Sequence, residues 1–384
     1  MTPAARLSAA ICCLDAILAG ASAEAALTGW GRSSRYAGSG DRHAVRDLVF
    51  DALRCMRSFA ALGGAQTGRG LILGGVRAAG LDPAALFTGD GHAPHPVDAD
   101  EAGYAPQGHA ALDCPDWLAP HLQASLGTDF AAVMQVMQRR APVFLRINTL
   151  KTDIDAAQAR LRQDGVETEP HPLSQTALQV LGAARKVQTS AAYLTGLVEL
   201  QDASSQAVVD HIGLRCGMRV LDYCAGGGGK TLAMAAALSG PVFAHDAAPG
   251  RMRDLPARAA RAGAAVTITD NPTKSAPYDV VLTDVPCSGS GSWRRDPAGK
   301  WALTPAKLTQ LCALQSDILT AASALVAPFG TLAYATCSLL NAENGDQIAG
   351  FLARNPQWAL QRRRIFTPRE GGDGFFTAVL TRVK

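Results

Sequence analysis

The sequence predicts an all-α N-terminal domain followed by an α/β domain with a doubly wound, Rossmann-like sheet, and a small α+β subdomain between the two. Apolar residues recur at helical spacing up to about residue 87. Short strand-like runs begin after Pro142, and helices and strands alternate regularly after Gln201. With 384 residues, the chain is long enough for two or three domains.

The helical domain is expected over residues 1–125. Leu7, Ile11 and Leu14 recur at the spacing of one helix face. A later helix is expected to begin near Asp41, whose carboxylate can cap its first turn. The stretch after residue 87 is rich in Gly, Pro and acidic residues, which predicts a loop before short helices resume.

The small α+β subdomain is expected over residues 126–200, with VFLRINTL and ALQVLG as strands and DIDAAQARLRQDG as the helix between them. The doubly wound sheet is expected over residues 201–384, with FFTAVLTR as an antiparallel edge strand. The expected strands of this sheet are RVLDYC, PVFAHD, AVTITD, DVVLTD, TLAYATC and FFTAVLTR.

Composition places the chain among globular proteins, since 48% of its residues are hydrophobic and 18% are charged. A net charge of +3 permits nucleic-acid binding without requiring it. The N-terminal stretch predicts an amphipathic helix rather than a signal peptide. Because no uninterrupted run of about 20 apolar residues occurs, no membrane-spanning helix and no membrane partner are expected.

Nine cysteines are dispersed along the chain, and none forms a C-x-x-C pair. We therefore expect no metal site and no disulfide scaffold. This cysteine pattern is typical of a protein in a reducing cytoplasm, and we expect a cytoplasmic monomer. A small buried apolar role is expected of Cys12, Cys13, Cys55, Cys114, Cys216 and Cys312.

A glycine-rich loop follows the first expected strand of the sheet, in VLDYCAGGGGKT. Glycines allow a backbone to approach a ligand closely at the start of a helix. A Walker A loop would need glycine where Cys224 stands, and a dinucleotide motif starting at Gly226 would need glycine at Thr231, so both are disfavoured. The expected cofactor-binding residues of this loop are Cys224, Ala225, Gly226, Gly227, Gly228, Gly229 and Lys230.

Acidic residues end the expected strands around this loop. Asp246 follows Asp222 by 24 residues, at the place where a carboxylate commonly binds ribose hydroxyls. Asp270 and Asp284 end the next two strands. One such aspartate alone is as well explained as a helix cap or a turn residue, but the series suits a ligand with ribose hydroxyls, an adenine amine and a positive charge. S-adenosyl-L-methionine has all three features.

Two cysteine-bearing segments, DVPCSG and TCS, place Cys287 and Cys337 50 residues apart. Each follows an expected buried strand, and strand ends of an open α/β sheet face the ligand crevice. The pattern therefore predicts two thiols and the Asp284 carboxylate at the mouth of the cofactor site. Paired thiols there suggest covalent chemistry on an electrophilic ring.

At these residues the chain resembles a family. DYCAGGGGKT resembles the first motif of RNA cytosine-C5 methyltransferases of the Sun/NOL/NOP type, usually D-x-C-A-A-P-G-G-K-T. DVPCSGSG followed by RRDPAGKW, and YATCSLLNAEN, are similar to its D-A-P-C-S-G-x-G, R-x-P-x-x-K-W and Y-x-T-C-S segments, the last with a trailing E-N. RINTLK and QDASS also fit, and SGDRHAVRDLVFDALR is similar to the helical domain shared with the antitermination factor NusB.

That domain order is similar to the bacterial Fmu/Sun type, which acts on 16S ribosomal RNA. The resemblance implies methylation of C5 of a cytosine in RNA, with ribosomal RNA favoured and transfer RNA as the alternative. Gly226-Gly227 stands where the family usually has Ala-Pro, and we expect this departure to make the loop more flexible and to weaken cofactor binding.

The resemblance also implies roles for single residues. Cys337 would attack C6 of the base, and Cys287 would help to eliminate the enzyme after methylation. Asp284 would hydrogen-bond the base near N3 and N4, and Lys230 is the cation expected to lower the pKa of the attacking thiol. Arg251 is included among the expected cofactor-binding residues.

Arginines and a lysine are the candidates for RNA phosphate contacts. A loop, a bulge or an immature RNA is the expected substrate, because the target base must be unstacked. The candidates that follow the Cys287 segment are Arg294, Arg295 and Lys300. The candidates of the helical domain are Arg32, Arg35, Arg42 and Arg46. A further group could equally well lie on a solvent-exposed face without binding RNA: Arg251, Arg253, Arg258, Arg261, Arg362, Arg363 and Arg364.

Two other function classes remain open at this point. A catalytically silent RNA-binding assembly factor is allowed by the altered glycine loop, but the retained thiols, Asp284 and Lys230 argue against it. A nicotinamide-dependent oxidoreductase is disfavoured by the glycine spacing.

Overall fold

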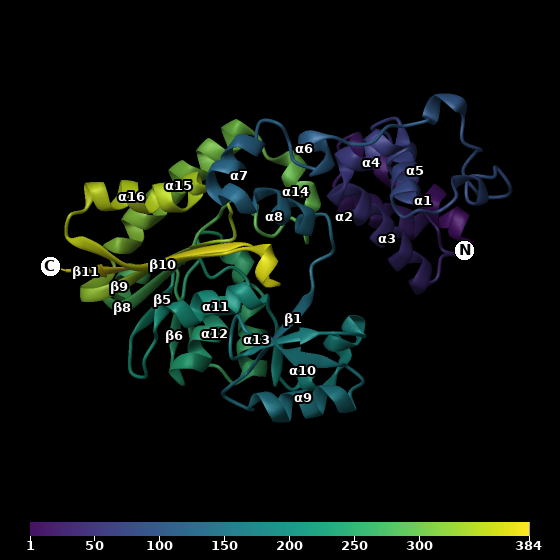
Figure 1. The fold of residues 1–384 in the computed structure, drawn as a ribbon. Coiled ribbons are helices and arrows are strands. Elements are labelled where there is room, and N and C mark those ends of the chain that lie inside the picture. Colours follow the sequence, from purple (N-terminus) through teal and green to yellow (C-terminus); the bar gives the residue numbers. More distant parts are fainter. Residues whose placement is uncertain (384) are drawn as a thin grey trace. The chain divides into compact units, whose positions relative to one another are not determined.

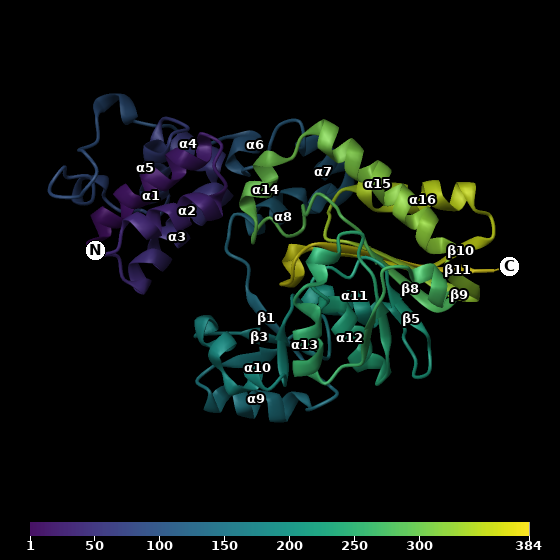
Figure 2. The same cartoon turned by 180° about the vertical axis from the view of Figure 1, so that it is seen from behind.

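The computed structural model describes residues 1–383, which form two compact units (Figures 1 and 2). The first unit comprises Met1–Arg140 and Trp293–Ala302, and the second comprises the rest of the described chain. The predicted fold class is confirmed: a helical N-terminal region accompanies a mixed α/β sheet of Rossmann-like order. The division at residues 125 and 200 stays a prediction.

All the regular elements of the first unit are helices, and irregular loops join them. Hydroxyl side chains accept a backbone N–H at the start of three of its helices, at Thr2, Ser22 and Thr67. Its helices are α1 (Pro3–Leu18), α2 (Ala23–Ser33), α3 (Ser39–Arg54), α4 (Met56–Gly63), α5 (Gly68–Ala78), α6 (Gly108–Ala111), α7 (Ala119–Leu126), α8 (Phe130–Met137) and α14 (Pro297–Ala302).

Asp41 is not the cap residue of its helix, which is Gly38. It lies at the third position of α3, where its carboxylate accepts the Gly38 N–H at 3.3 Å. The same carboxylate pairs with Arg6 at 2.9 Å and with the N-terminal ammonium of Met1 at 3.2 Å. Asp41 therefore ties the start of α1 to the start of α3 as well as closing its own helix.

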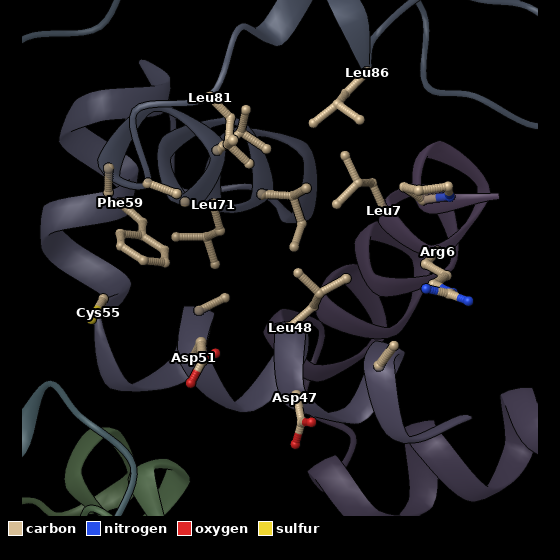
Figure 3. Close-up of a pocket in the computed structure, with 18 of the residues that line it drawn as sticks. Arg6, Leu7, Asp47, Leu48, Asp51, Cys55, Phe59, Leu71, Leu81 and Leu86 are labelled. Carbon is tan, nitrogen blue, oxygen red and sulfur yellow. The ribbon is translucent and has the colours of Figure 1, made fainter. Parts of the chain in front are cut away.

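The core of the first unit lies between α1, α3 and α5, where Leu14, Val45 and Leu71 are fully buried. Beside this core is a cavity of about 800 Å³, which Figure 3 shows in close-up. Its wall is mainly aliphatic, and Asp47 and Asp51 lie at its rim. The helical amphipathicity of the sequence thus accounts for this unit.

The second unit contains two sheets, of which the smaller is four-stranded in the order β2-β3-β1-β4, with the described pairs antiparallel. Two of these strands, β2 and β4, lie outside the β-α-β pattern that the sequence predicted. Its elements are β1 (Val143–Ile147), α9 (Ile154–Gln163), β2 (Thr168–Pro170), β3 (Ala177–Val180), α10 (Ala191–Leu194) and β4 (Val198–Leu200).

The larger sheet has seven strands in the order β10-β11-β9-β8-β5-β6-β7. Strands β5 to β9 pair in parallel, and β11 is antiparallel to β9 and β10. Its elements are α11 (Ala203–Ile212), β5 (Val220–Asp222), α12 (Gly229–Leu238), β6 (Val242–Ala244), α13 (Leu255–Ala262), β7 (Val266–Ile268), β8 (Tyr278–Asp284), α15 (Pro305–Ser323), β9 (Val326–Thr336), α16 (Gly345–Arg354), β10 (Trp358–Phe366) and β11 (Phe375–Arg382).

Helices cover both faces of this sheet (Figure 1). Val280 and Leu282 on β8 pack with α11 and α12, whereas Val281 packs with α15 and α16 on the other face. Because neighbouring side chains of a strand point to opposite faces, a strand covered on both sides is apolar at every position. That is why VVLTD was recognisable as a buried strand.

The predicted edge strand β11 is antiparallel, but it lies inside the sheet, between β9 and β10. The edge is β10, whose sequence WALQRRRIF was not expected to be a strand. Its central residues are exposed, so they lack the apolar pattern of a buried strand. Arg362 on β10 donates to the carbonyls of His211 and Ile212 at the end of α11.

Trp293–Ala302 is a segment of the second half of the sequence that belongs to the first unit. It directly follows the Cys287 loop and is called the strap here. Arg54 donates to the carbonyl of Arg294 at 2.7 Å, and Lys300 donates to the carbonyl of Arg54 at 3.0 Å. Trp301 donates its indole N–H to the Leu53 carbonyl at 2.7 Å.

Among residues 1–383, no helix is both long enough and apolar enough to span a membrane.

Candidate active site

The carboxyl ends of β5, β8 and β9 carry Asp222, Asp284 and Thr336, the last followed by Cys337. Strand β5 lies between β6 and β8, so the connections turn to opposite sides of β5. In an open α/β sheet this switch point is where a ligand crevice forms. The sequence motifs therefore meet at the expected edge of the sheet.

The glycine loop lies between the end of β5 and the start of α12. Gly226 and Gly228 have φ of +51° and +82°, a region that residues with a side chain rarely adopt. The buried Asp246 carboxylate accepts the Gly226 N–H at 2.9 Å and the Ala248 N–H at 2.9 Å. Arg251 pairs with the same carboxylate at 3.2 Å.

Asp222 is buried beneath this loop, and its Oδ2 accepts the Thr231 hydroxyl at 2.7 Å. Its other oxygen has no hydrogen-bond partner among the described residues. Burial, opposed by the Thr231 hydrogen bond, raises the pKa of Asp222 to about 7. An orphaned carboxyl oxygen beside a glycine loop fits a ligand that carries ammonium or hydroxyl donors, as S-adenosyl-L-methionine does.

Asp270 and Cys224, two other expected cofactor-binding residues, differ in exposure. Asp270 follows β7, the edge strand of the sheet, and is exposed. Cys224 is half-buried at the start of the loop, and burial raises the pKa of its thiol far above the ordinary value. A thiol in that state is not a nucleophile at neutral pH.

Lys230 is the second residue of α12 and is 7% exposed. Its ammonium lies 2.8 Å from Oδ2 of Asp284 and 4.8 Å from the ring centre of Phe375. Burial disfavours the charged amine, but the charge and hydrogen bond of Asp284 outweigh burial and raise the pKa of Lys230. The pair is therefore an ammonium–carboxylate ion pair at neutral pH.

The two predicted thiols meet, with the Sγ atoms of Cys287 and Cys337 3.4 Å apart. The hydrogen bond from Cys287 and the charge of Lys230 lower the pKa of Cys337, against burial and the charge of Asp284. The same hydrogen bond, burial and the charge of Glu343 raise the pKa of Cys287. The two pKa shifts have opposite signs, so Cys337 is the thiol of the pair that ionises more easily.

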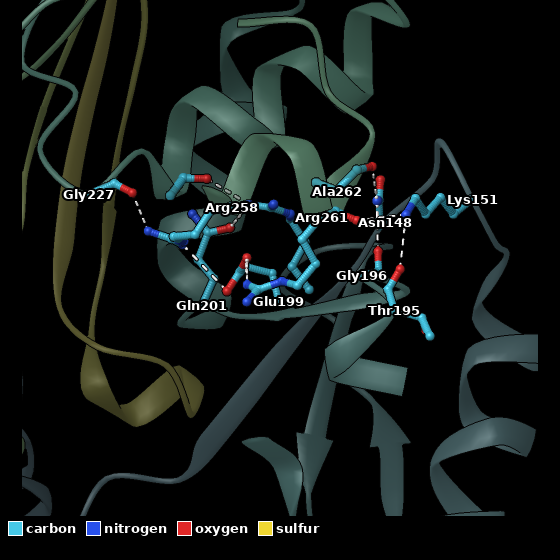
Figure 4. A network of polar contacts seen from close by, with 12 residues as sticks. Asn148, Lys151, Thr195, Gly196, Glu199, Gln201, Gly227, Arg258, Arg261 and Ala262 are labelled. Carbon is cyan, nitrogen blue, oxygen red and sulfur yellow. Dashed lines mark hydrogen bonds and ion pairs between the residues drawn. The ribbon is translucent and has the colours of Figure 1, made fainter. Parts of the chain in front are cut away.

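Figure 4 shows a polar network that joins the small sheet to the glycine loop within the second unit. Arg258 on α13 donates to the Gly227 carbonyl and pairs with Glu199 of β4 at 3.5 Å. Arg261 pairs with the other Glu199 oxygen at 2.7 Å. From β1, the buried Arg146 donates to the Gly229 carbonyl at 2.7 Å.

Several arginines expected to contact RNA or solvent have internal partners instead. Arg258 and Arg261 are held by Glu199, since a half-buried guanidinium needs a compensating charge. Arg294 and Lys300 are 3% and 2% exposed within the first unit, so they are not available to phosphates. Arg46 pairs with Glu24 at 2.5 Å, so its guanidinium is less available to bind a phosphate.

Three residues of the site were not predicted as functional: Arg146, Glu199 and Glu343. Arg146 lies in the RINTLK motif and Glu343 in the trailing E-N of the Cys337 segment. The resemblance therefore marked both residues, but it did not indicate what either one does. Glu199 had no signal, because its importance comes from α13 residues about 60 positions away.

The comparisons with known proteins agree with this geometry. Residues 212–381 match the family described as 16S rRNA methyltransferase RsmB/F, and residues 114–188 match the ferredoxin-like domain of RsmF/B-like methyltransferases. Ribosomal RNA small subunit methyltransferase B of Photorhabdus laumondii is 31% identical over an alignment 284 positions long, which covers 70% of this chain and 66% of that protein. Its counterpart in Citrobacter koseri is 33% identical over 69% of this chain and 66% of the relative.

The chain thus spans just under two thirds of the length of these relatives. Among solved structures, PH0851 superposes with a TM-score of 0.77 at 23% identity, covering 99% of both chains. NSun6 from Pyrococcus horikoshii superposes with a TM-score of 0.63 at 17% identity, over 70% of this chain and 98% of its own. These two likenesses show the fold. The sequence relatives and the two matched regions show that the chain contains the methyltransferase and ferredoxin-like domains of the RsmB/F, or Sun, family.

Proposed function

We propose that this protein uses S-adenosyl-L-methionine to methylate C5 of a cytosine in 16S ribosomal RNA through a covalent adduct at C6. The observation that carries the proposal is the thiol pair, with Sγ atoms 3.4 Å apart and pKa shifts of opposite sign, next to the Lys230–Asp284 ion pair. The relatives' name, ribosomal RNA small subunit methyltransferase B, supports the choice of RNA.

The cofactor assignment rests on the glycine loop and its carboxylates. S-adenosyl-L-methionine supplies a methyl group on a sulfonium when it is bound. In this chain Asp246 shapes the loop through two backbone N–H groups, and the orphaned Asp222 oxygen offers an acceptor beside it. NSun6 from P. horikoshii was solved with SFG, an analogue of this cofactor, which supports the same assignment for the shared fold.

Cys337 is assigned as the nucleophile because its pKa is lowered, whereas that of Cys287 is raised. Addition of Sγ to C6 moves the electron pair of the C5–C6 double bond onto C5 and N3, which makes C5 nucleophilic. Asp284 is assigned to bind the N3 and N4 edge of the base, and Lys230, 2.8 Å from its carboxylate, to balance its charge. Addition at C6 thus needs a thiolate near C6 and a polar partner at N3, the roles proposed for Cys337 and Asp284.

Cys287 is assigned to the release step. Once Cys337 is a neutral thioether, its negative charge no longer raises the pKa of Cys287, which can then lose its proton to solvent. The Cys287 thiolate takes the proton from C5, the C5–H electrons restore the double bond, and Cys337 leaves as a thiolate. The net yield is one released proton per methyl group transferred, and the thiol pair returns to its starting state.

RNA is the proposed macromolecular partner, and the helical unit offers one site for its phosphates. A hollow of about 420 Å³ beside α2 and α3 is lined by Trp30, Arg32, Arg42, His43 and Arg46. Arg32 and Arg42 are exposed there. A cluster of arginines with an aromatic ring suits a single-stranded segment of RNA.

The test is the asymmetry of two cysteine variants. Cys337→Ala is expected to abolish methyl transfer and to form no covalent RNA adduct. Cys287→Ala is expected to methylate once and then stall as a covalent protein–RNA complex that survives denaturing electrophoresis and disappears with RNase. The double variant is the control and should give no adduct.

The opposite pattern, an adduct with Cys337→Ala and none with Cys287→Ala, would exchange the two roles. If the wild-type protein binds RNA but neither binds S-adenosyl-L-methionine nor methylates, it is a silent assembly factor. Mapping 5-methylcytosine in RNA from a deletion strain distinguishes ribosomal RNA from transfer RNA, the alternative substrate.

A further inference from the structure

Glu343 is a fully buried carboxylate that the steps above do not use. It ends a short 3-10 turn, Asn341–Glu343, that follows the Cys337 segment. The Tyr334 hydroxyl donates to the main-chain carbonyl of Glu343 at 2.6 Å, which attaches the turn to β9. A buried carboxylate needs hydrogen bonds or charges around it, so its partners indicate what it holds in place.

Four donors converge on this carboxylate, two on each oxygen. Oε1 accepts the Ser288 backbone N–H at 2.7 Å and the Gln315 side-chain amide at 3.0 Å. Oε2 accepts the hydroxyls of Ser288 and Ser338, each at 2.5 Å. A carboxylate only accepts hydrogen bonds, so it satisfies all four donors at once, which a neutral amide of the same shape cannot do.

Three contacts of this cluster bracket Cys287. Glu343 holds the following residue, Ser288, through both its N–H and its hydroxyl. The buried Gln315 on α15 holds the preceding residue, because it also donates to the Pro286 carbonyl at 2.9 Å. The backbone on each side of the Cys287 thiol is therefore fixed by one buried pair.

Cys337, the other thiol, depends less on Glu343 than Cys287 does. Ser338 is only five residues from Glu343 in sequence, and Cys337 directly continues strand β9. Cys337 therefore keeps its strand and its own turn if the carboxylate is lost. Ser288 is 55 residues away and depends on the carboxylate for two hydrogen bonds.

We propose that Glu343, together with Gln315, is a positioning residue that fixes Cys287 for the release step of methyl transfer. This inference rests on the proposed function. It explains how the Cys287 sulfur is held in position, which the two thiols alone do not. In that step the Cys287 sulfur takes the C5 proton while the bond between Cys337 Sγ and C6 breaks. The geometry of that proton transfer is sensitive to displacements of about 1 Å.

Glu343→Gln is the test, because the amide keeps the size of the side chain and turns one acceptor into a donor. The first turnover, measured with bound radiolabelled cofactor in a rapid quench, is expected to stay within about threefold of the wild-type rate. Multiple turnover is expected to fall by about tenfold or more, with covalent protein–RNA adduct accumulating in proportion. Adding Cys337→Ala should remove that adduct.

Glu370→Gln is the matched control, since Glu370 is a glutamate of the same unit that pairs with Arg364 near the protein surface. It should change neither rate nor adduct. Ser288→Ala, which removes one donor and leaves the backbone N–H, should give the Glu343→Gln pattern in weaker form. This second variant decides the question if Glu343→Gln does not fold.

Equal slowing of the first turnover and of release, without adduct, would overturn the proposal, because Glu343 would then support Cys337 or the fold alone. Wild-type rates without adduct in both variants would overturn it as well. Failure of the proposed function is distinguishable, since the wild-type protein would then form no 5-methylcytosine and Cys287→Ala would trap no RNA.

Discussion

At the scale of single residues, neighbouring groups shift the pKa values of the two thiols in opposite directions. The charge of Lys230 and the hydrogen bond of Cys287 favour a thiolate on Cys337, whereas the same hydrogen bond, burial and Glu343 favour a thiol on Cys287. In the proposed mechanism this difference makes Cys337 the nucleophile and Cys287 the base of the release step. Environment rather than residue type assigns the roles.

Asp246→Ala is expected to weaken binding of S-adenosyl-L-methionine by about 1–3 kcal/mol, the scale of a hydrogen bond to a charged group. The carboxylate fixes the Gly226 and Ala248 N–H groups, so its loss also loosens the loop. Titration calorimetry measures the change. Asp254→Ala is the control, because Asp254 is exposed and pairs only with Arg253 in the described contacts. Equal affinity in the two variants would remove Asp246 from the site.

Asp222 predicts a pH dependence of stability. Burial raises its pKa from 3.8 to about 7 in the folded protein, so the folded state binds more protons than the unfolded state between these values. The free energy of unfolding therefore falls as pH rises from about 4 through 7, by up to about 1.4 kcal/mol per pH unit.

Asp222→Asn should remove this part of the pH dependence and raise the thermal midpoint at pH 8 more than at pH 5. Calorimetric unfolding of both proteins over that range measures it. A parallel pH dependence in wild type and variant would mean that Asp222 is ionised in the folded protein throughout.

At the scale of elements, the glycine loop is held from outside. Two glycines replace the usual Ala-Pro, which leaves more conformational freedom to lose on folding or binding. Arg258 on α13 and Arg146 on β1 bind the Gly227 and Gly229 carbonyls, and Glu199 on β4 orients Arg258. The small sheet is thus a support of the glycine loop and not only a spacer.

Arg258→Ala is expected to weaken S-adenosyl-L-methionine binding by about 1–2 kcal/mol, because the Gly227 carbonyl loses its charged partner. Arg253→Ala is the matched control, since its side chain is 84% exposed. Calorimetry on both variants checks the effect. If the two variants bind the cofactor equally well, the loop does not depend on Arg258.

At the scale of the whole molecule, the chain leaves the second unit after the Cys287 loop, adds the strap to the first unit, and returns. Lys300 is buried there, and burial lowers its pKa to about 8 despite the nearby Asp113. The strap hydrogen bonds to Leu53 and Arg54 need residues of the N-terminal sequence. The units are therefore not independent segments of sequence.

A protein that lacks residues 1–140 is expected to aggregate or to unfold at lower temperature, because the strap loses its partners and exposes Trp293 and Trp301. Replacing residues 293–302 with a short Gly/Ser linker in the truncated protein should restore solubility. The repaired protein should keep cofactor affinity and lose RNA affinity, with a shallower salt dependence, because the phosphate contacts proposed for Arg32 and Arg42 are gone. Unchanged RNA affinity and salt slope would assign the helical unit another role, such as protein docking.

The sequence by itself determined the fold class, the glycine loop and the meeting of Asp284, Lys230, Cys287 and Cys337. These features are local: an apolar strand, a turn and a reactive residue at its end are encoded within a few positions, and parallel strand ends meet at one edge. The roles of these residues stay proposals until the variants are measured.

Only the tertiary structure determined which distant residues hold these side chains and loops in place. Glu343 holds Ser288 across 55 residues, Glu199 holds Arg261 across 62, and Lys300 holds the Arg54 carbonyl across 246. The sequence does not predict the edge strand β10, because an exposed strand lacks the apolar pattern of a buried one. It places β11 at the edge of the sheet, because the strands that pair with β11 cannot be read from local sequence. Local sequence patterns record which face of an element is apolar, whereas partners of buried charges are set by the folded packing of distant segments.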